Sequence, residues 1–174
     1  MSEWFAENWF SLTSIFALIL GGIFAIIQWN KNIKLKHAEF IIQIIEKLRF
    51  DKSMADAMYL IDYDGEWYSE DFHGSGEKEF TIDKLLSYFS YICYLEDVHH
   101  ITKKEFSILE YELRRACDSS QIQGYLFNLY HFSRETNSTC SFQYLIDYGL
   151  REGIIKKDVF TNKNSDEYPH YLSF

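Results

Sequence analysis

The stretch WFSLTSIFALILGGIFAII, residues 9–27, contains no charged side chain, and eleven of its nineteen residues are Leu, Ile or Phe. A helix of this length extends about 28 Å, close to the roughly 30 Å of a hydrocarbon core. As a core helix, it would have to be enclosed on every side by the rest of a 174-residue chain. The stretch therefore predicts one transmembrane helix.

A cleaved signal peptide is the second interpretation of an apolar run near an N-terminus. It requires basic residues before the run and a small-residue cleavage site after it. Glu3 and Glu7 precede the run, with no Lys or Arg, and no such cleavage site follows. The run is therefore predicted to remain in the chain as an anchor.

Basic residues gather on the C-terminal side of the run, at Lys31, Lys34 and Lys36. The positive-inside rule then predicts an N-terminus outside the cell and residues 30–174 in the cytoplasm. Trp9 and Trp29 stand at the two ends of the run. Because tryptophan favours the membrane–water interface, we expect both residues, with the three lysines, to anchor the span.

Small residues recur every four positions within the span, at Ala17, Gly21 and Ala25, with Ser14 one turn before them. Such a stripe lets helix backbones approach closely, which predicts self-association. The alternative is that Gly and Ala are simply common in single spans. Since the span has no ionisable group, a charged ion filter is excluded. A pore would be lined by small residues, apolar rings or the hydroxyls of Ser11, Thr13 and Ser14.

The remainder of the chain has a helical composition, with 47% apolar residues, 8 glycines and one proline. Apolar spacings of three and four continue the membrane helix toward Phe50 and predict four further helices. The first is expected to be capped by Thr81, the second to begin at Thr102, the third to be capped by Ser119 or Ser120, and the last to begin at about Ser141. The predicted inward side chains are Leu85, Leu86, Phe89, Ile92 and Cys93 on the first, Phe106, Leu109, Leu113 and Cys117 on the second, and Ile122, Tyr125, Leu126 and Leu129 on the third. Thr102 and Glu105 fit a capping box. We expect an all-α protein with a cytoplasmic bundle of four to five helices. Its predicted parts are an outside segment and span at residues 1–29, a helical domain at 30–158 and a C-terminal tail at 159–174, whose aromatic residues predict docking.

Residues 51–79 carry nine acidic groups against two lysines, so they hold much of the formal net charge of -9. An EF-hand starting at Asp62 is excluded, because Trp67 and His73 occupy the positions that require Gly and Glu. Two interpretations remain: a solvated loop, or an acidic rim that faces a channel mouth or a partner.

The net charge of -9 also argues against binding of duplex nucleic acid over a broad face. Three widely spaced cysteines predict reduced thiols rather than a disulfide framework. Neither a phosphate-binding glycine loop nor a nucleophile elbow occurs, so no cofactor is predicted. His99 and His100 are possible metal ligands, but the side chains of adjacent residues on a helix point in different directions, so both could not face one metal ion. A favourable interaction of histidine with the C-terminal end of a helix explains their presence equally well.

A ribonuclease of the HEPN type would need an Arg-x(4–6)-His motif, and no arginine of this chain has a histidine at that spacing. Arg114, Arg115 and His131 are the ribonuclease-like candidates that remain, because neighbouring helices can bring them together. In such a site histidine accepts the 2′-hydroxyl proton and arginine stabilises phosphate charge. The alternative is a salt-bridged arginine pair and a partly exposed histidine.

The chain has one predicted span, then a basic segment, NKNIKLKHAEF, and then a helical block that contains LLSYFSYICYLEDVHHITKKEF. This layout resembles that of the small single-span membrane accessory proteins of type VI-B CRISPR systems, a divergent HEPN-like family. The resemblance implies a homo-oligomeric, ring-like pore in the bacterial inner membrane. It also implies a functional link to the RNA-guided CRISPR ribonuclease and enhanced antiviral defence through membrane depolarisation, with no ribonuclease activity of its own. A membrane-anchored HEPN-type ribonuclease and a non-pore membrane adaptor for a soluble partner are the alternatives.

Overall fold

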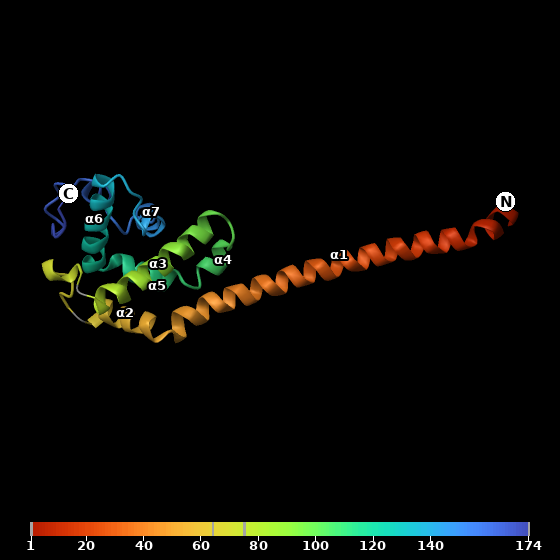
Figure 1. Ribbon diagram of the computed structural model, residues 1–174, viewed down its shortest axis with the longest axis horizontal. Helices are drawn as coiled ribbons and strands as arrows, with labels where there is room; N and C mark the ends of the chain where they lie inside the picture. Colours follow the sequence, from red (N-terminus) through yellow and green to blue (C-terminus); the bar gives the residue numbers. More distant parts are fainter. Residues whose placement is uncertain (1, 64, 75, 174) are drawn as a thin grey trace. The chain divides into compact units, whose positions relative to one another are not determined.

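The computed structural model describes residues 2–63, 65–74 and 76–173, with the side chains of residues 2–7 and 12 left aside (Figure 1). All regular elements in these ranges are helical, which confirms the predicted all-α fold. They are α1 (Ser2–Phe50), α2 (Lys52–Tyr63), the 3-10 turn η1 (Glu70–Phe72), α3 (Glu77–Asp97), α4 (Lys103–Phe106), α5 (Glu110–Asp118), α6 (Ser120–Glu135), α7 (Gln143–Arg151) and α8 (Lys157–Phe160).

The chain divides into two compact units, one ending at Ile44 and the other beginning at Ile45. Most of α1 forms the first unit. As predicted, the helix continues beyond the apolar stretch as far as Phe50, and its backbone stays helical through Gly21 and Gly22.

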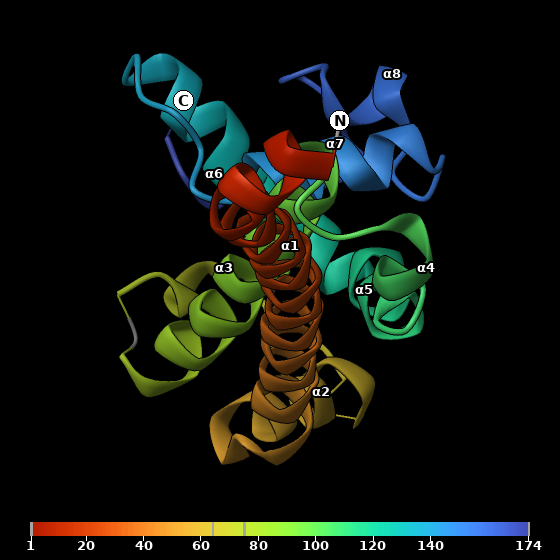
Figure 2. The ribbon, with the colours of Figure 1, turned by 90° about the vertical axis from the view of Figure 1, so that its right-hand side faces the viewer.

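Helix α3 runs through the middle of the second unit and contacts both α2 and α7 (Figures 1 and 2). Its predicted inner face is confirmed, since Leu85, Leu86, Phe89 and Ile92 are fully buried. Thr81 does not cap this helix as predicted. The helix begins four residues earlier, because Gly76 turns the chain at a φ of 90° and acidic residues then suit the positive N-terminal end of the helix.

The predicted capping box is confirmed: Thr102 Oγ1 accepts from Glu105 N, and Thr102 N donates to Glu105 Oε2. The helix it opens is shorter than expected. α4 ends at Phe106 and the chain re-enters a helix at Glu110. The expected apolar face nevertheless forms across the break, because Phe106, Leu109 and Leu113 are all buried.

Ser119 caps α6 as predicted, with its hydroxyl accepting from Ile122 N at 3.5 Å. The C-terminal tail packs on this helix, and Asn128 of α6 holds it there. The Asn128 amide donates to Pro169 O at 2.6 Å and accepts from the backbone N–H groups of Tyr171 and Leu172 at 2.8 and 3.0 Å. The prediction that the tail docks is therefore confirmed.

The segment between α2 and α3 is not the solvated loop offered as one interpretation. Trp67, Tyr68 and Phe72 are buried around Tyr125 of α6, with ring centroids 5.4 to 6.5 Å from the Tyr125 ring. Burial of three aromatic rings outweighs the cost of ordering an acidic connection. The acidic side chains at Glu66, Glu70 and Asp71 remain exposed.

All three cysteines, Cys93, Cys117 and Cys140, are free and buried. Burial raises the pKa of each thiol, to about 12 for Cys117.

Asp51 precedes α2, and its carboxylate accepts from the Ser53 hydroxyl at 2.7 Å and from Lys84 Nζ at 2.9 Å. First the Ser53 hydroxyl and then Lys84 hold the pKa of Asp51 well below its ordinary value. A lowered folded-state pKa stabilises the fold above the unfolded-state pKa of about 3.9, and this contribution is lost as the pH falls toward the folded-state value.

We therefore expect Asp51→Asn to lower the melting temperature at pH 7, and the difference from the unmodified chain to shrink between pH 5 and pH 3. Thermal unfolding followed by tryptophan fluorescence, to which the buried Trp67 contributes, measures this. Asp118→Asn changes an exposed carboxylate and serves as the control. A difference that stays constant from pH 7 to pH 3 would contradict the expectation.

Candidate membrane-association site

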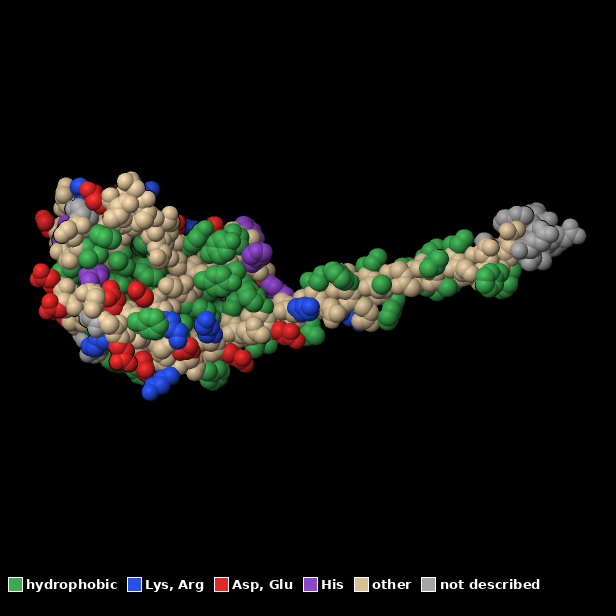
Figure 3. Space-filling view, in the orientation of Figure 1, with side chains coloured by type: hydrophobic (Ala, Val, Ile, Leu, Met, Phe, Trp, Pro, Cys, Tyr) green, Lys and Arg blue, Asp and Glu red, His purple; other side chains and the backbone are tan. Residues whose placement is uncertain are grey.

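One helix of the described chain is long and apolar enough to cross a membrane. It comprises Asn8–Phe50, and its most apolar window has a mean hydropathy of 2.4 with none of that window buried. Figure 3 shows apolar side chains along the outside of this helix. An uncovered apolar surface of this length is unfavourable in water and favourable in hydrocarbon.

Bulky and small side chains occupy different sides of the span. At about 100° per residue, and counting from Ala17, the predicted stripe residues Gly21, Ser14 and Ala25 lie at about 40°, 60° and 80°. The large exposed residues from Ile15 to Ile27 fill the arc from about 100° to about 340°; they are Ile15, Phe16, Leu18, Ile19, Leu20, Ile23, Phe24, Ile26 and Ile27. The small residues of the stripe therefore leave a shallow groove along one side of the helix surface.

The two glycines of the span are open to their surroundings. A Cβ atom added at Gly21 or at Gly22 meets nothing within 4 Å. Gly21 lies within the stripe, whereas Gly22 lies at about 140°, outside it. The two positions thus differ in direction but not in local crowding.

The hydroxyls of Thr13 and Ser14 are satisfied by the backbone of their own helix. Ser14 Oγ donates to Phe10 O at 2.8 Å, and Thr13 Oγ1 lies 3.0 Å from Trp9 O and 2.9 Å from Phe10 O. Such bonds allow these residues to lie in hydrocarbon without an unpaired polar group. Ser11, Thr13 and Ser14 spread over about 160° of the circumference, so they do not form one polar face.

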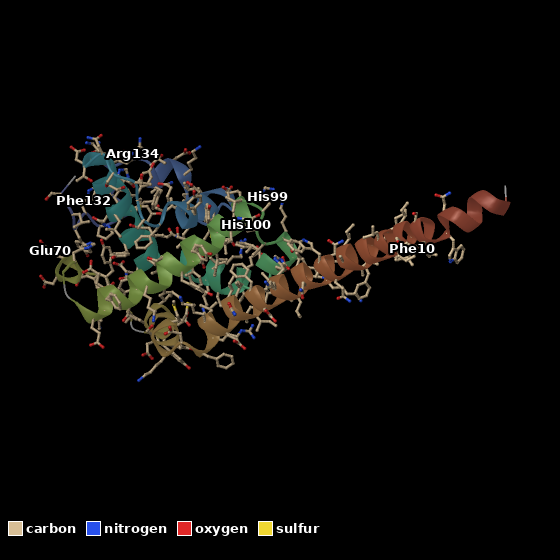
Figure 4. The ribbon with its side chains drawn as sticks, turned by 45° about the vertical axis from the view of Figure 1, so that its right-hand side comes forward. Phe10, Glu70, His99, His100, Phe132 and Arg134 are labelled. Carbon is tan, nitrogen blue, oxygen red and sulfur yellow. The ribbon has the colours of Figure 1, made fainter. Side chains whose placement is uncertain are left out.

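Two polar residues extend the stripe, and the sequence analysis did not identify them as candidates. Gln28 and Asn32 lie at about 20° and 60°, on the same side as Gly21, and both are exposed. Side-chain amides at such positions form hydrogen bonds between membrane helices. The signal was the continuation of the spacing by three and four residues beyond Ala25. At the other end of the stripe, Phe10 lies at about 20° (Figure 4).

The predicted interface anchors are accessible. Trp9 and Trp29 expose 66% and 70% of their surfaces, so neither packs within its own chain. The lysines following the span are also exposed: Lys31, Lys34 and Lys36.

The ribonuclease-like candidates do not share one hollow. Arg114 and Arg115 line one with Tyr111, and His131 lines another at the C-terminal end of α6. Arg115 pairs with Asp62 at 3.2 Å, and Arg114 lies 3.8 Å from carboxylates of Glu110 and of Glu152. His131 is buried rather than partly exposed, with Nε2 2.9 Å from Phe160 O.

The possible metal ligands after α3 are also dispersed. His99 and His100 lie in the turn that follows the helix (Figure 4), where His99 has a φ of 61° and its Nδ1 lies 2.8 Å from Asp97 O. Glu96 is paired with Arg151 at 3.0 Å. Over residues 2–63, 65–74 and 76–173, no three His, Cys, Asp or Glu side chains are placed to hold a metal ion.

Comparison of the chain with protein-family models, with curated proteins and with solved structures gives no match.

Proposed function

We propose that this protein is a single-pass membrane protein that self-associates through α1 and opens an ion path in the bilayer. The observation that carries the proposal is the uncovered apolar span of α1, with a stripe of small residues, Ala17, Gly21 and Ala25, along one side of it. Lipid does not drive helices together by hydrophobic burial, so close approach along a small-residue stripe is the means of association available to such a helix.

The proposed orientation places the N-terminus outside and the helical domain in the cytoplasm of a bacterial cell, with α1 in the inner membrane. Its support is the group of exposed lysines that follows the span, whereas no Lys or Arg precedes it. Three free, buried thiols are consistent with a reducing compartment.

The proposed biological role is antiviral defence linked to an RNA-guided type VI-B CRISPR ribonuclease, and its support is the resemblance described above. A ring of copies would dissipate the membrane potential, which is worth about 2.3 kcal/mol per elementary charge at 100 mV. The domain acts in this proposal as a support for the assembly, with no catalytic step.

Reconstitution of the full-length protein into liposomes that hold a potassium diffusion potential tests the proposal. We expect the potential to collapse, and the rate to rise more steeply than linearly with protein density, because several copies build each path. A potential-sensitive dye outside the liposomes gives the measurement.

Inserted and assembled protein that leaves the potential intact would overturn the pore and favour a membrane adaptor. Incubation of the same preparation with single-stranded RNA tests the ribonuclease alternative. Cleavage that is lost in both Arg115→Ala and His131→Ala would favour that alternative, provided that each variant remains folded.

A further inference from the structure

A hollow of about 400 Å³ lies in the second unit, at the C-terminal end of α6. Its lining comes from two segments: His131, Arg134 and Glu135 from α6, and Thr161 and Lys163 from the turn after α8. The volume falls within the range of small-molecule pockets in proteins, about 300 to 1,000 Å³. This hollow contributes nothing to the membrane association proposed above.

Positive charge gathers in this hollow although the chain carries a net charge of -9. Among the described residues, no carboxylate lies within ion-pair distance of Arg134 or Lys163, and both side chains are exposed. Elsewhere in this unit Lys84, Arg114, Arg115 and Arg151 each have a carboxylate within that distance. Glu135 is the one acidic residue of the lining. The two cations are therefore available to an anion from solution.

Tyr130 orients Arg134. The guanidinium donates through Nη1 to the Tyr130 hydroxyl at 2.6 Å and lies 5.4 Å from the centroid of the Tyr130 ring. Figure 4 shows Arg134 at this end of α6. A guanidinium held in this way loses little further conformational freedom when it binds a ligand.

His131 forms the floor of the hollow. Its Nε2–H donates to Phe160 O at 2.9 Å, since a carbonyl oxygen can only accept. Burial lowers the pKa of His131, and the positive charges of Arg134 and Lys163 lower it further. The field at this residue is thus positive and comes from both segments of the lining.

We propose that the hollow binds a small phosphorylated molecule, whose phosphoryl oxygens contact Arg134 and Lys163. A guanidinium and an ammonium group are the side chains best suited to phosphoryl oxygens. A compact ligand is favoured over a nucleic-acid strand, because Glu135 and the acidic surface repel a long polyanion, which would need a continuous basic face.

Titration calorimetry of the full-length protein in detergent micelles tests the site, with inorganic pyrophosphate as the probe, low salt and no divalent cations. We expect saturable binding by the unmodified chain. Arg134→Gln and Lys163→Gln should each weaken it about tenfold, the loss expected for one charge-assisted hydrogen bond. Lys104→Gln removes an exposed lysine outside the hollow and should leave the affinity unchanged.

Three results would overturn the proposal: no saturable binding, equal affinity in all three variants, or binding of a single-stranded RNA oligonucleotide through Arg134 and Lys163 without binding of pyrophosphate. The changed side chains are exposed, so each variant should fold; circular dichroism checks this. The calorimetry does not measure ion leakage, so absence of binding at this hollow would leave the proposed pore unaffected. Likewise, absence of leakage from liposomes would leave the proposed binding site unaffected.

Discussion

Gly21→Leu is expected to weaken self-association of the protein in micelles by about tenfold or more and to slow ion leakage in proportion. A leucine at this position fills the shallow side of α1 and prevents close approach of the helix backbones. A tenfold loss of association corresponds to about 1.4 kcal/mol. The variant chain itself should remain helical, because an added Cβ meets nothing within 4 Å and leucine favours helix more than glycine does. Sedimentation equilibrium in detergent gives the association constant.

The neighbouring glycine supplies a matched control. Gly22→Leu makes the same change in volume, hydropathy and helix propensity, again with no neighbour within 4 Å, but on a side of α1 outside the stripe. We expect it to retain assembly and leakage. If the two variants behave alike, the stripe does not mediate association, and that part of the proposal fails.

Asn128→Ala is expected to lower the free energy of unfolding by about 3 kcal/mol, because it removes a fully buried amide together with its hydrogen bonds to four backbone groups. The Asn128 side chain is fully buried and makes four hydrogen bonds, to Gly124 O, Pro169 O, Tyr171 N and Leu172 N. Three of these four hold the tail against α6. Urea unfolding followed by tryptophan fluorescence, to which the buried Trp67 contributes, measures the loss.

Limited proteolysis should show, in addition, faster cleavage after residue 165 in Asn128→Ala than in the unmodified chain. Asn164→Ala changes an exposed asparagine of the same tail and should alter neither measurement. An Asn128→Ala protein as stable as Asn164→Ala would show that contacts of the tail other than this amide suffice to hold it.

Much of the fold could be predicted because its signals are local. An uncharged apolar run predicts, from its length and composition, a helix long enough to cross a membrane, and Thr102 with Glu105 fixes a helix start through bonds between residues three apart. The inner faces of α3 and α6 follow from apolar spacing, because every turn of a helix returns the same side to the core.

The features that could not be predicted depend on distant partners. Trp67, Tyr68 and Phe72 are buried because Tyr125, more than fifty residues later, provides a surface for them. Likewise, the hollow with Arg134 and Lys163 exists because the chain after α8 returns to the end of α6. In both cases the contacting residues are far apart in the sequence, and the spacing of residues along the chain does not indicate that they meet.

The burial of Cys93, Cys117 and Cys140 has a practical consequence for mapping the orientation of the chain. Maleimides react with thiolates, and a buried thiol with a raised pKa offers them neither access nor charge. A single cysteine introduced beside Trp9 or beside Trp29 would thus be the one fast-reacting thiol of the chain. Membrane-impermeant reagents applied to intact cells, or to inverted vesicles, would then report which compartment each end of the apolar stretch faces.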